Sequence, residues 1–145
     1  MKADVLFSRK SDEWGTPQEF YAELNKEFQF DLDPASTDSN ALCPCHFTQK
    51  QDGLLQDWGG HSVFCNPPYS HIGEWIRKGW QESCKDGTTV VMLVPSRTDT
   101  RWFHQYVLHR AEVRFVTGRI KFGDSAYNAP FPSMVVIWRA GGITA

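Results

Sequence analysis

The sequence predicts a single α/β domain in which a mostly parallel central sheet is flanked by helices. Strand-like and helix-like segments alternate along the chain. The most continuously apolar of them, residues 88–94, suits a strand that is covered on both faces. A length of 145 residues is enough for one core and too short for a separate recognition domain. With 41% hydrophobic and 22% charged residues, the composition excludes a disordered or collagen-like chain.

The first helix is predicted over residues 17–27. Thr16-Pro17-Gln18-Glu19 has the form of a capping box with proline at the first helical position. Apolar residues then recur at helical spacing, namely Phe20, Tyr21, Leu24 and Phe28. Residues 28–33 alternate apolar and polar side chains and stop at a proline, which predicts a strand with Asp33 at its carboxyl end. Residues 34–60 are rich in turn-forming types and are predicted to be mostly irregular.

The remaining elements continue the alternation. A short strand at residues 61–65 is followed by a break at two prolines and then by a helix with Ile72, Trp75, Ile76 and Trp80 on one face. The buried strand at residues 88–94 precedes a helix whose apolar stripe is Trp102, Phe103, Tyr106 and Val107. Two further strands, residues 112–117 and 134–138, are separated by a long loop. Since α/β sheets bind ligands at the carboxyl ends of their strands, we expect the site there.

The folded domain is placed at residues 13–139, with residues 1–12 expected to form a flexible N-terminal segment and residues 140–145 a tail. No apolar run approaches the roughly 20 residues that cross a bilayer, and the first residues lack a signal-peptide pattern. We therefore expect a cytoplasmic protein without a membrane partner. The four cysteines are too few for a disulfide scaffold and are expected to be reduced.

The charge is distributed unevenly although the net charge is only −2. Residues 1–60 carry five Lys or Arg against eleven Asp or Glu, whereas residues 61–145 carry ten against six. The basic residues of the second part that can form one phosphate-facing surface are Arg97, Arg101, Arg110, Arg114, Arg119 and Lys121. An ordinary solvated face is the alternative interpretation of such a charge pattern.

The segment Asn66-Pro67-Pro68-Tyr69 lies between a predicted strand and a predicted helix. Its two prolines hold the backbone extended and lack N–H groups, which leaves carbonyl oxygens beside an amide and an aromatic ring. Asn66 Oδ1 and the Pro67 carbonyl can each accept a hydrogen from an amino group while the Tyr69 ring stacks on a planar ligand. The segment predicts a pocket for a planar group that bears NH₂, and a rigid turn with a partly buried tyrosine is the alternative.

This tetrapeptide resembles the catalytic motif of amino-methyltransferases that depend on S-adenosylmethionine. Over residues 13–139 the chain is similar to the short phage-type DNA N6-adenine methyltransferases. The collinear motifs that carry the similarity are Trp14-Gly15-Thr16-Pro17, Asp31-Leu32-Asp33-Pro34-Ala35, Asp52-Gly53-Leu54-Leu55, Asn66-Pro67-Pro68-Tyr69 and Gly118-Arg119-Ile120-Lys121-Phe122. Asn-Pro-Pro-Tyr by itself also suits protein-glutamine and RNA-adenine methyltransferases, so the ordered set supplies most of the specificity.

The resemblance implies a trimmed Rossmann-like methyltransferase fold and transfer of a methyl group to N6 of a flipped adenine in DNA. The residues that it implies are Asn66, Pro67, Pro68 and Tyr69 for catalysis, and Thr16, Pro17, Asp33, Pro34, Asp52 and Asn66 for S-adenosylmethionine. Candidates for DNA contact are Arg97, Arg101, Arg119 and Lys121. A non-catalytic nucleic-acid-binding domain of the same fold is the second hypothesis.

The segment between Asp33 and Asp52 departs from the wider methyltransferase pattern. No Gly-x-Gly follows Ala35, and the 18 intervening residues are too few for a full strand–helix–strand unit, which predicts a trimmed sheet. Asn40 is a candidate for the cofactor's ribose. Cys43-Pro44-Cys45-His46 contains metal-ligand types, but the two other cysteines stand alone in other elements, so no metal is predicted.

Overall fold

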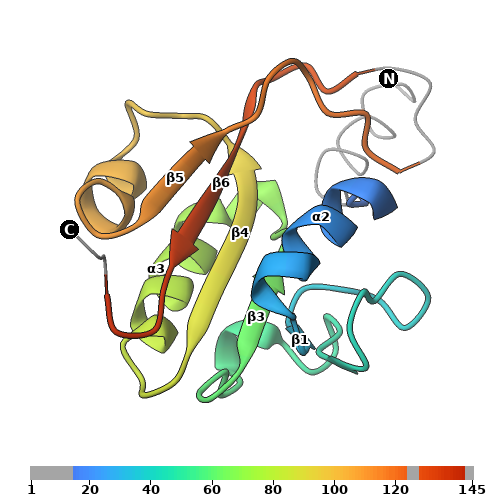
Figure 1. Ribbon diagram of the computed structural model, residues 1–145, viewed down its shortest axis with the longest axis vertical. Coiled ribbons are helices and arrows are strands. Elements are labelled where there is room, and N and C mark those ends of the chain that lie inside the picture. Colours follow the sequence, from blue (N-terminus) through green and yellow to red (C-terminus); the bar gives the residue numbers. More distant parts are fainter. Residues whose placement is uncertain (1–14, 124–127, 143–145) are drawn as a thin grey trace.

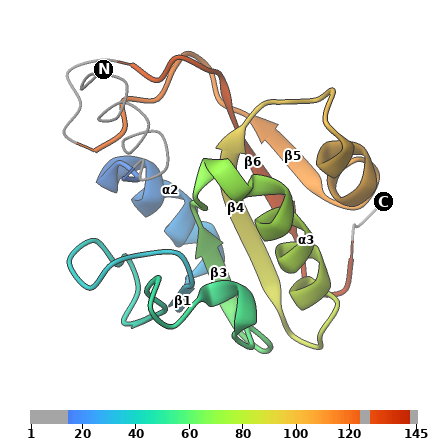
Figure 2. The same cartoon turned by 180° about the vertical axis from the view of Figure 1, so that it is seen from behind.

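The computed structural model describes residues 15–123 and 128–142, and its centre is one six-stranded sheet in the order β2-β1-β3-β4-β6-β5. Helix α2 (Gln18–Phe28) covers one face of this sheet. Helix α3 (Ile72–Ser83) and the short π-helix η3 (Phe103–Val107) lie on the other side (Figures 1 and 2). The predicted single-domain α/β fold is therefore confirmed.

The strands are β1 (Leu32–Asp33), β2 (Cys45–His46), β3 (Ser62–Cys65), β4 (Thr89–Pro95), β5 (Glu112–Phe115) and β6 (Ser133–Trp138). The pairs β2–β1, β1–β3 and β3–β4 are parallel, and β6 is antiparallel to both β4 and β5. Thus β6 alone is reversed, and the other strands end on one side, at the top of Figure 1. We call that side the carboxyl edge and the opposite side the amino edge.

The central strand β4 is apolar because it is buried between two layers. Val90, Met92 and Val94 belong to the core cluster that contains residues of α3, whereas Val91 and Leu93 belong to the cluster on the α2 side. All five side chains are fully buried. Each fully buried aliphatic side chain contributes about 1.5–3 kcal/mol relative to exposure. The predicted strand covered on both faces is confirmed, shifted by one residue.

The predicted strand over residues 28–33 is wrong in its first part. Helix α2 continues to Phe28, and Gln29 ends it in the left-handed conformation with φ of 50°. Asn25 Oδ1 then accepts a hydrogen bond from the Phe30 backbone N–H at 2.7 Å, and the Phe28 and Phe30 rings stack with centroids 5.6 Å apart. The apolar alternation therefore reflects the packing of a helix end and a turn, and only two residues remain for β1.

Residues 34–60 are mostly irregular, as predicted, but they contain two short elements. Strand β2 pairs with β1 through only two residues, and η1 (Gly53–Leu55) is a single 3₁₀ turn. The sheet is therefore trimmed on this side, in agreement with the short spacing between Asp33 and Asp52.

The helix expected around Trp102 to Val107 is present as a π turn, closed by a hydrogen bond from the Leu108 N–H to the Phe103 carbonyl at 2.8 Å. In the described part of the chain, the helices are all too short and too polar to pass through a bilayer. The N-terminal segment predicted at residues 1–12, the motif residue Trp14 and the last three residues of the predicted tail lie outside the described residues.

Candidate active site

The Asn66-Pro67-Pro68-Tyr69 segment leaves β3 at the carboxyl edge and enters the 3₁₀ turn η2 (Tyr69–His71), which runs directly into α3. Pro68 is extended, with φ of −60° and ψ of 127°. Asn66 Nδ2 donates a hydrogen bond to Thr16 Oγ1 at 3.0 Å, although the two residues are 50 positions apart. The structure thus brings together one residue implied for catalysis and one implied for the cofactor.

Thr16 does not act as the predicted helix cap. The capping position of α2 is Pro17, which makes no side-chain capping hydrogen bond, and the helix begins at Gln18. Thr16 therefore precedes the cap, and its hydroxyl accepts from Asn66 instead. Because no capping side chain at Pro17 satisfies them, the first N–H groups of α2 suit an anionic ligand.

Tyr69 is half-buried, and its hydroxyl is enclosed. Its ring lies edge-on to Phe131, with centroids 5.5 Å apart and an interplanar angle of 74°. Burial raises the pKa of Tyr69 above its ordinary value, so the phenol is protonated at neutral pH. Phe131 was not among the predicted site residues. The signal available for it was an aromatic residue held between Pro130 and Pro132 in the long loop.

Asp33 is buried at the end of β1, with 4% of its surface exposed. Its Oδ1 accepts from the Ala35 N–H at 3.4 Å and its Oδ2 from the Leu42 N–H at 3.2 Å. Burial raises the pKa of Asp33, and the two backbone donors oppose that shift by favouring the carboxylate. The carboxyl group therefore anchors the loop that follows β1 to the carboxyl edge.

Asp52 reaches the same edge because Gly53 packs directly on Pro34. A Cβ at position 53 would overlap the Pro34 carbonyl oxygen and lie 3.0 Å from Trp75 Cη2, so only glycine fits. The Gly53 carbonyl also accepts a hydrogen bond from Trp58 Nε1 at 2.9 Å. Asp52 itself has φ of 58° and accepts from the Leu54 N–H through Oδ1 at 3.1 Å. Two more of the segments implied for the cofactor are thereby held together.

Asn40 is exposed and closes its own turn, since its Oδ1 accepts from the Thr37 N–H at 2.7 Å. Cys43 Sγ lies 3.3 Å from Tyr21 Oη in the core, and His46 Nε2 lies 2.9 Å from Asp38 Oδ1. The hydrogen bond to Asp38 raises the pKa of His46. Within residues 15–123 and 128–142, His, Cys, Asp and Glu form no cluster of three that could hold a metal ion.

The four DNA-contact candidates all follow strands that end at the carboxyl edge. Arg97 and Arg101 are exposed in the segment after β4. Arg119 and Lys121 are exposed in the segment after β5, which passes over this edge toward the start of α2 (Figure 1). The Gly123 N–H donates to the Gly15 carbonyl there at 2.8 Å.

Two other basic residues lie elsewhere, so the prediction of one basic surface that includes all six is wrong. Arg110 lies over the Trp80 ring, 5.2 Å from its centroid. Arg114 donates to both carboxylate oxygens of Glu27 at 2.8 Å. Their charges are therefore used in packing and ion pairing.

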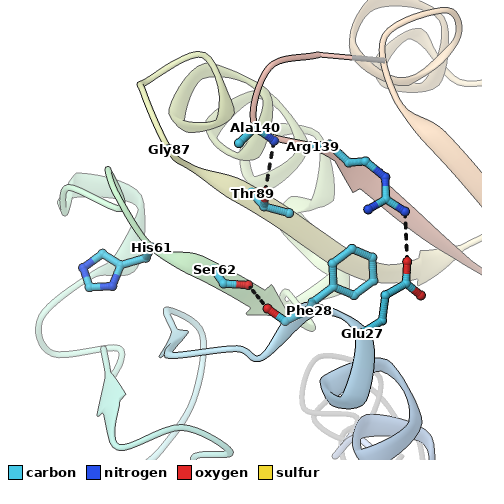
Figure 3. A pocket seen from close by; sticks show the side chains of 8 residues that line it. All are labelled: Glu27, Phe28, His61, Ser62, Gly87, Thr89, Arg139 and Ala140. Atoms are coloured by element: carbon cyan, nitrogen blue, oxygen red, sulfur yellow. Dashed lines mark hydrogen bonds and ion pairs between the residues drawn. The ribbon is translucent and has the colours of Figure 1, made fainter. Parts of the chain in front are cut away.

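A surface hollow of about 330 Å³ lies at the amino edge and contains none of the predicted site residues (Figure 3). Most of its polar groups are paired with one another; the exception is His61 Nδ1, which is buried without a hydrogen bond to the described residues and lies 3.3 Å from Asp31 Oδ2. Arg139 Nη2 donates to Glu27 Oε2 at 3.0 Å, Ser62 Oγ donates to the Phe28 carbonyl at 2.7 Å, and the Ala140 N–H donates to Thr89 Oγ1 at 3.0 Å. Because these groups already have partners, we interpret the hollow as a feature of the fold and place the site at the carboxyl edge.

The chain is similar to known proteins over most of its length. Residues 5–141 match the family model described as DNA N-6-adenine-methyltransferase (Dam). The chain is 31% identical over 141 residues to the DNA N-6-adenine-methyltransferase of Haemophilus phage HP1, covering 90% of this chain and 82% of the relative. It is 31% identical over 107 residues to the enzyme of the same name from Escherichia phage T1, covering 72% of this chain and 44% of the relative. The chain belongs to the DNA N-6-adenine-methyltransferase family.

Proposed function

We propose that this protein transfers the methyl group of S-adenosylmethionine to the N6 amino group of adenine in DNA, with the target base flipped into a pocket at Asn66-Pro67-Pro68-Tyr69. The observation that carries the proposal is the hydrogen bond from Asn66 Nδ2 to Thr16 Oγ1 at 3.0 Å. It joins the segment implied for the target base to the segment implied for the cofactor. The names of the two phage relatives support the same substrate.

The residues at the carboxyl edge fit S-adenosylmethionine by their chemistry. The N–H groups at the start of α2, next to Thr16 and Pro17, suit the cofactor's carboxylate. Asp33 and Asp52 offer carboxylate oxygens for its hydroxyl and amino groups, and a carboxylate has about four acceptor sites, so the backbone contacts do not exhaust it. Pro34 lies against Gly53 between them. When bound, S-adenosylmethionine supplies an electrophilic methyl group.

Asn66 and Pro67 act on the amino group of the target. The hydrogen bond to Thr16 fixes the orientation of the Asn66 amide, so that Nδ2 is turned toward Thr16 and Oδ1 to the other side. Oδ1 and the Pro67 carbonyl accept the amino hydrogens and favour the pyramidal nitrogen of the transition state over the conjugated ground state. Neither group is a general base, so the proton that the methylated nitrogen loses passes to solvent. Alignment of the nitrogen supplies most of the rate.

Aromatic rings compensate for the stacking that the base loses. A base inside a duplex is inaccessible, so the adenine has to leave the stack or come from single-stranded DNA. Tyr69 and Phe131 form an aromatic pair beside Asn66, and stacking on such rings contributes about 1–3 kcal/mol per base. Arg97, Arg101, Arg119 and Lys121 are placed to contact phosphates around this edge.

The direct test is to incubate the purified protein with isotopically labelled S-adenosylmethionine and DNA, then to digest the DNA and identify labelled nucleosides by mass spectrometry. N6-methyladenine is expected. Label in protein or RNA but not in DNA would replace the proposed substrate. DNA binding without any transfer would instead support the non-catalytic alternative.

A matched pair of threonine substitutions tests the observation that carries the proposal. Thr16→Val removes the acceptor of the Asn66 amide and is expected to lower turnover by roughly tenfold, because one hydrogen bond contributes on the order of 1 kcal/mol. Thr89→Val removes a comparable bond to the Ala140 N–H at the amino edge and should leave turnover unchanged. Equal turnover in the two variants would contradict the role assigned to Thr16.

A further inference from the structure

Trp58 holds the 3₁₀ turn that follows Asp52. Its side chain is fully buried, and the indole Nε1 donates a hydrogen bond to the Gly53 carbonyl at 2.9 Å. The Trp58 and Trp75 rings stack with centroids 6.2 Å apart, and Trp75 Cη2 would lie only 3.0 Å from a Cβ at position 53. The residue after Asp52 is therefore fixed by a hydrogen bond from one tryptophan and by packing against the other.

Helix α3 supports Trp58 with side chains from one of its faces. Trp75, Lys78 and Glu82 stand three and four residues apart, the spacing that places side chains on the same side of a helix. The Trp58 backbone N–H donates to Glu82 Oε1 at 2.6 Å, and Lys78 Nζ lies 5.5 Å from the centroid of the Trp58 ring. Lys78 Nζ also donates to the Gln56 carbonyl at 2.5 Å. These bonds tie the turn to α3.

Asp52 needs this support because its backbone is in an uncommon conformation. Its φ of 58° and ψ of 92° lie outside the three main regions that L-residues occupy. Such a conformation persists only where the surrounding structure over-determines it. Asp52 Oδ1 accepts from the Leu54 N–H at 3.1 Å, and Oδ2 has no hydrogen-bond partner within residues 15–123 and 128–142. The turn therefore leaves one carboxylate oxygen for a ligand.

We propose that Trp58 is a positioning residue that sets the affinity for S-adenosylmethionine by fixing the orientation of the Asp52 carboxylate through the Gly53 carbonyl. This inference rests on the proposed function and deepens it, because it assigns part of the cofactor affinity to a fully buried side chain. Lys78 contributes in the same way through the Gln56 carbonyl.

The test compares two tryptophans that donate the same kind of bond. Trp58→Phe removes the donor to the Gly53 carbonyl, and Trp138→Phe removes the donor from Nε1 to the Tyr106 carbonyl, also at 2.9 Å. The two side chains are 0% and 2% exposed, so both variants should lower the thermal midpoint. Only Trp58→Phe should weaken binding of S-adenosylhomocysteine, the demethylated cofactor, by roughly tenfold in the Kd measured by calorimetry.

Steady-state kinetics gives a second readout. KM for S-adenosylmethionine should rise by about the same factor in Trp58→Phe. At saturating cofactor, kcat should stay within about twofold of the parental value, because the Asn66-Pro67-Pro68-Tyr69 segment is unchanged. A variant that had only lost folded protein would instead show a lowered kcat with KM unchanged.

A double-mutant cycle tests the route through Asp52. Asp52→Asn keeps an oxygen for the Leu54 N–H and tolerates a positive φ, but it removes the second carboxylate oxygen. In the Asp52→Asn background, Trp58→Phe should change the Kd of S-adenosylhomocysteine by no more than about twofold, because the affected contact is already lost.

A lysine variant keeps the inference testable if Trp58→Phe does not fold. Lys78→Met retains an aliphatic side chain of similar length and removes the bond to the Gln56 carbonyl. It should weaken binding of S-adenosylhomocysteine by roughly fivefold to tenfold. Lys26→Met, which removes an ion pair with Glu23 within α2, should leave this affinity unchanged.

Each of the following results would overturn the inference. Equal affinity for S-adenosylhomocysteine in Trp58→Phe, Lys78→Met and their controls would do so and leave the proposed function intact. An undiminished loss in the Asp52→Asn background would assign the effect of Trp58 to another route. If the unmodified protein does not bind S-adenosylhomocysteine at all, the proposed function fails together with the inference.

Discussion

The two edges of the sheet differ in whether their polar groups have hydrogen-bond or ion-pair partners. At the amino edge Glu27, Glu112, Arg114 and Arg139 form a closed network of ion pairs with N–O distances between 2.6 and 3.1 Å. Phe28 lies beneath both guanidinium groups, with its centroid 5.7 and 5.1 Å from their carbon atoms. At the carboxyl edge the buried hydroxyls of Tyr69, Ser96 and Ser133 have no hydrogen-bond partner among the described residues, whereas the corresponding atom near the amino edge, His61 Nδ1, lies 3.3 Å from the Asp31 carboxylate.

The acidic residues show the same difference in the direction of their pKa shifts. Hydrogen bonds from Arg114 and Arg139 lower the pKa of Glu27 from its ordinary value of 4.5 to about 2, so folding favours its charged form. Burial raises the pKa of Asp33, so folding disfavours its charged form. Polar groups at the amino edge stabilise the fold, whereas those at the carboxyl edge are held at a cost in stability. Whether the polar groups that line a hollow already have partners is therefore a guide to whether it binds a ligand.

The largest expected effect is on turnover. It distinguishes Asn66 at the carboxyl edge from Asn25 near the amino edge. Asn66→Ala should lower turnover by ~10²-fold or more, because it removes an acceptor needed as the amino group reacts. Asn25→Ala removes the acceptor of the Phe30 N–H and should lower the thermal midpoint while turnover is retained. Methyl incorporation and thermal melts measure the two effects. Parental turnover in folded Asn66→Ala would place catalysis elsewhere.

The next effect concerns the aromatic pair. Tyr69→Ala should raise KM for DNA by roughly tenfold or more and also slow turnover, since base–aromatic stacking contributes about 1–3 kcal/mol. Tyr69→Phe keeps the ring against Phe131 and should have a much smaller effect on KM. Steady-state kinetics with an adenine-containing duplex compares them. If the alanine and phenylalanine variants are equally impaired, the ring face is not the acting group.

A smaller effect distinguishes arginines that pair with an acidic residue from arginines that have no such partner within residues 15–123 and 128–142. Arg97→Ala and Arg101→Ala should each reduce the slope of log affinity against log salt by about one, because each removes one phosphate contact. Arg114→Ala should leave the slope unchanged and lower the thermal midpoint, because its charge is paired with Glu27 and Glu112. DNA binding by fluorescence anisotropy over a salt series measures the slope. Unchanged slopes for both Arg97 and Arg101 would move the DNA surface to another part of the molecule.

The smallest expected effect is that of Glu27→Gln on the free energy of unfolding. Because its folded pKa is lowered, its contribution to stability is present above about pH 4.5 and is lost as the pH falls toward 2. Glu27→Gln should remove this acid-dependent part of the unfolding free energy. The total should be at most ~1 kcal/mol, since the pair is more than one-third exposed. Denaturant titrations from pH 2 to 7 measure it, and methyl transfer at neutral pH should be unchanged. A loss of activity in this variant would contradict the assignment of the amino edge to stability and of the carboxyl edge to function.

Several features were predictable from the sequence because they depend on local pattern. The apolar run at residues 88–94 predicted β4 between two layers, and the proline-rich break after residues 61–65 predicted the strand–turn–helix passage at Asn66. Failures occurred where local pattern was overridden by packing. The alternation at residues 28–31 belongs to a helix end, and the apparent capping threonine serves Asn66 instead.

The sequence by itself determined the order of the elements, the trimmed second strand, the membership of the family and the segments that reach the carboxyl edge. Only the tertiary structure decided which of those segments meet. Thr16 contacts Asn66 across 50 positions, and Phe131 reaches Tyr69 because β6 returns antiparallel beside β4. The hydroxyls of Ser96 and Ser133 carry no sequence signal, since serine is common in loops and at strand ends. That they are buried without a hydrogen-bond partner among the described residues is set by the packing of the whole chain.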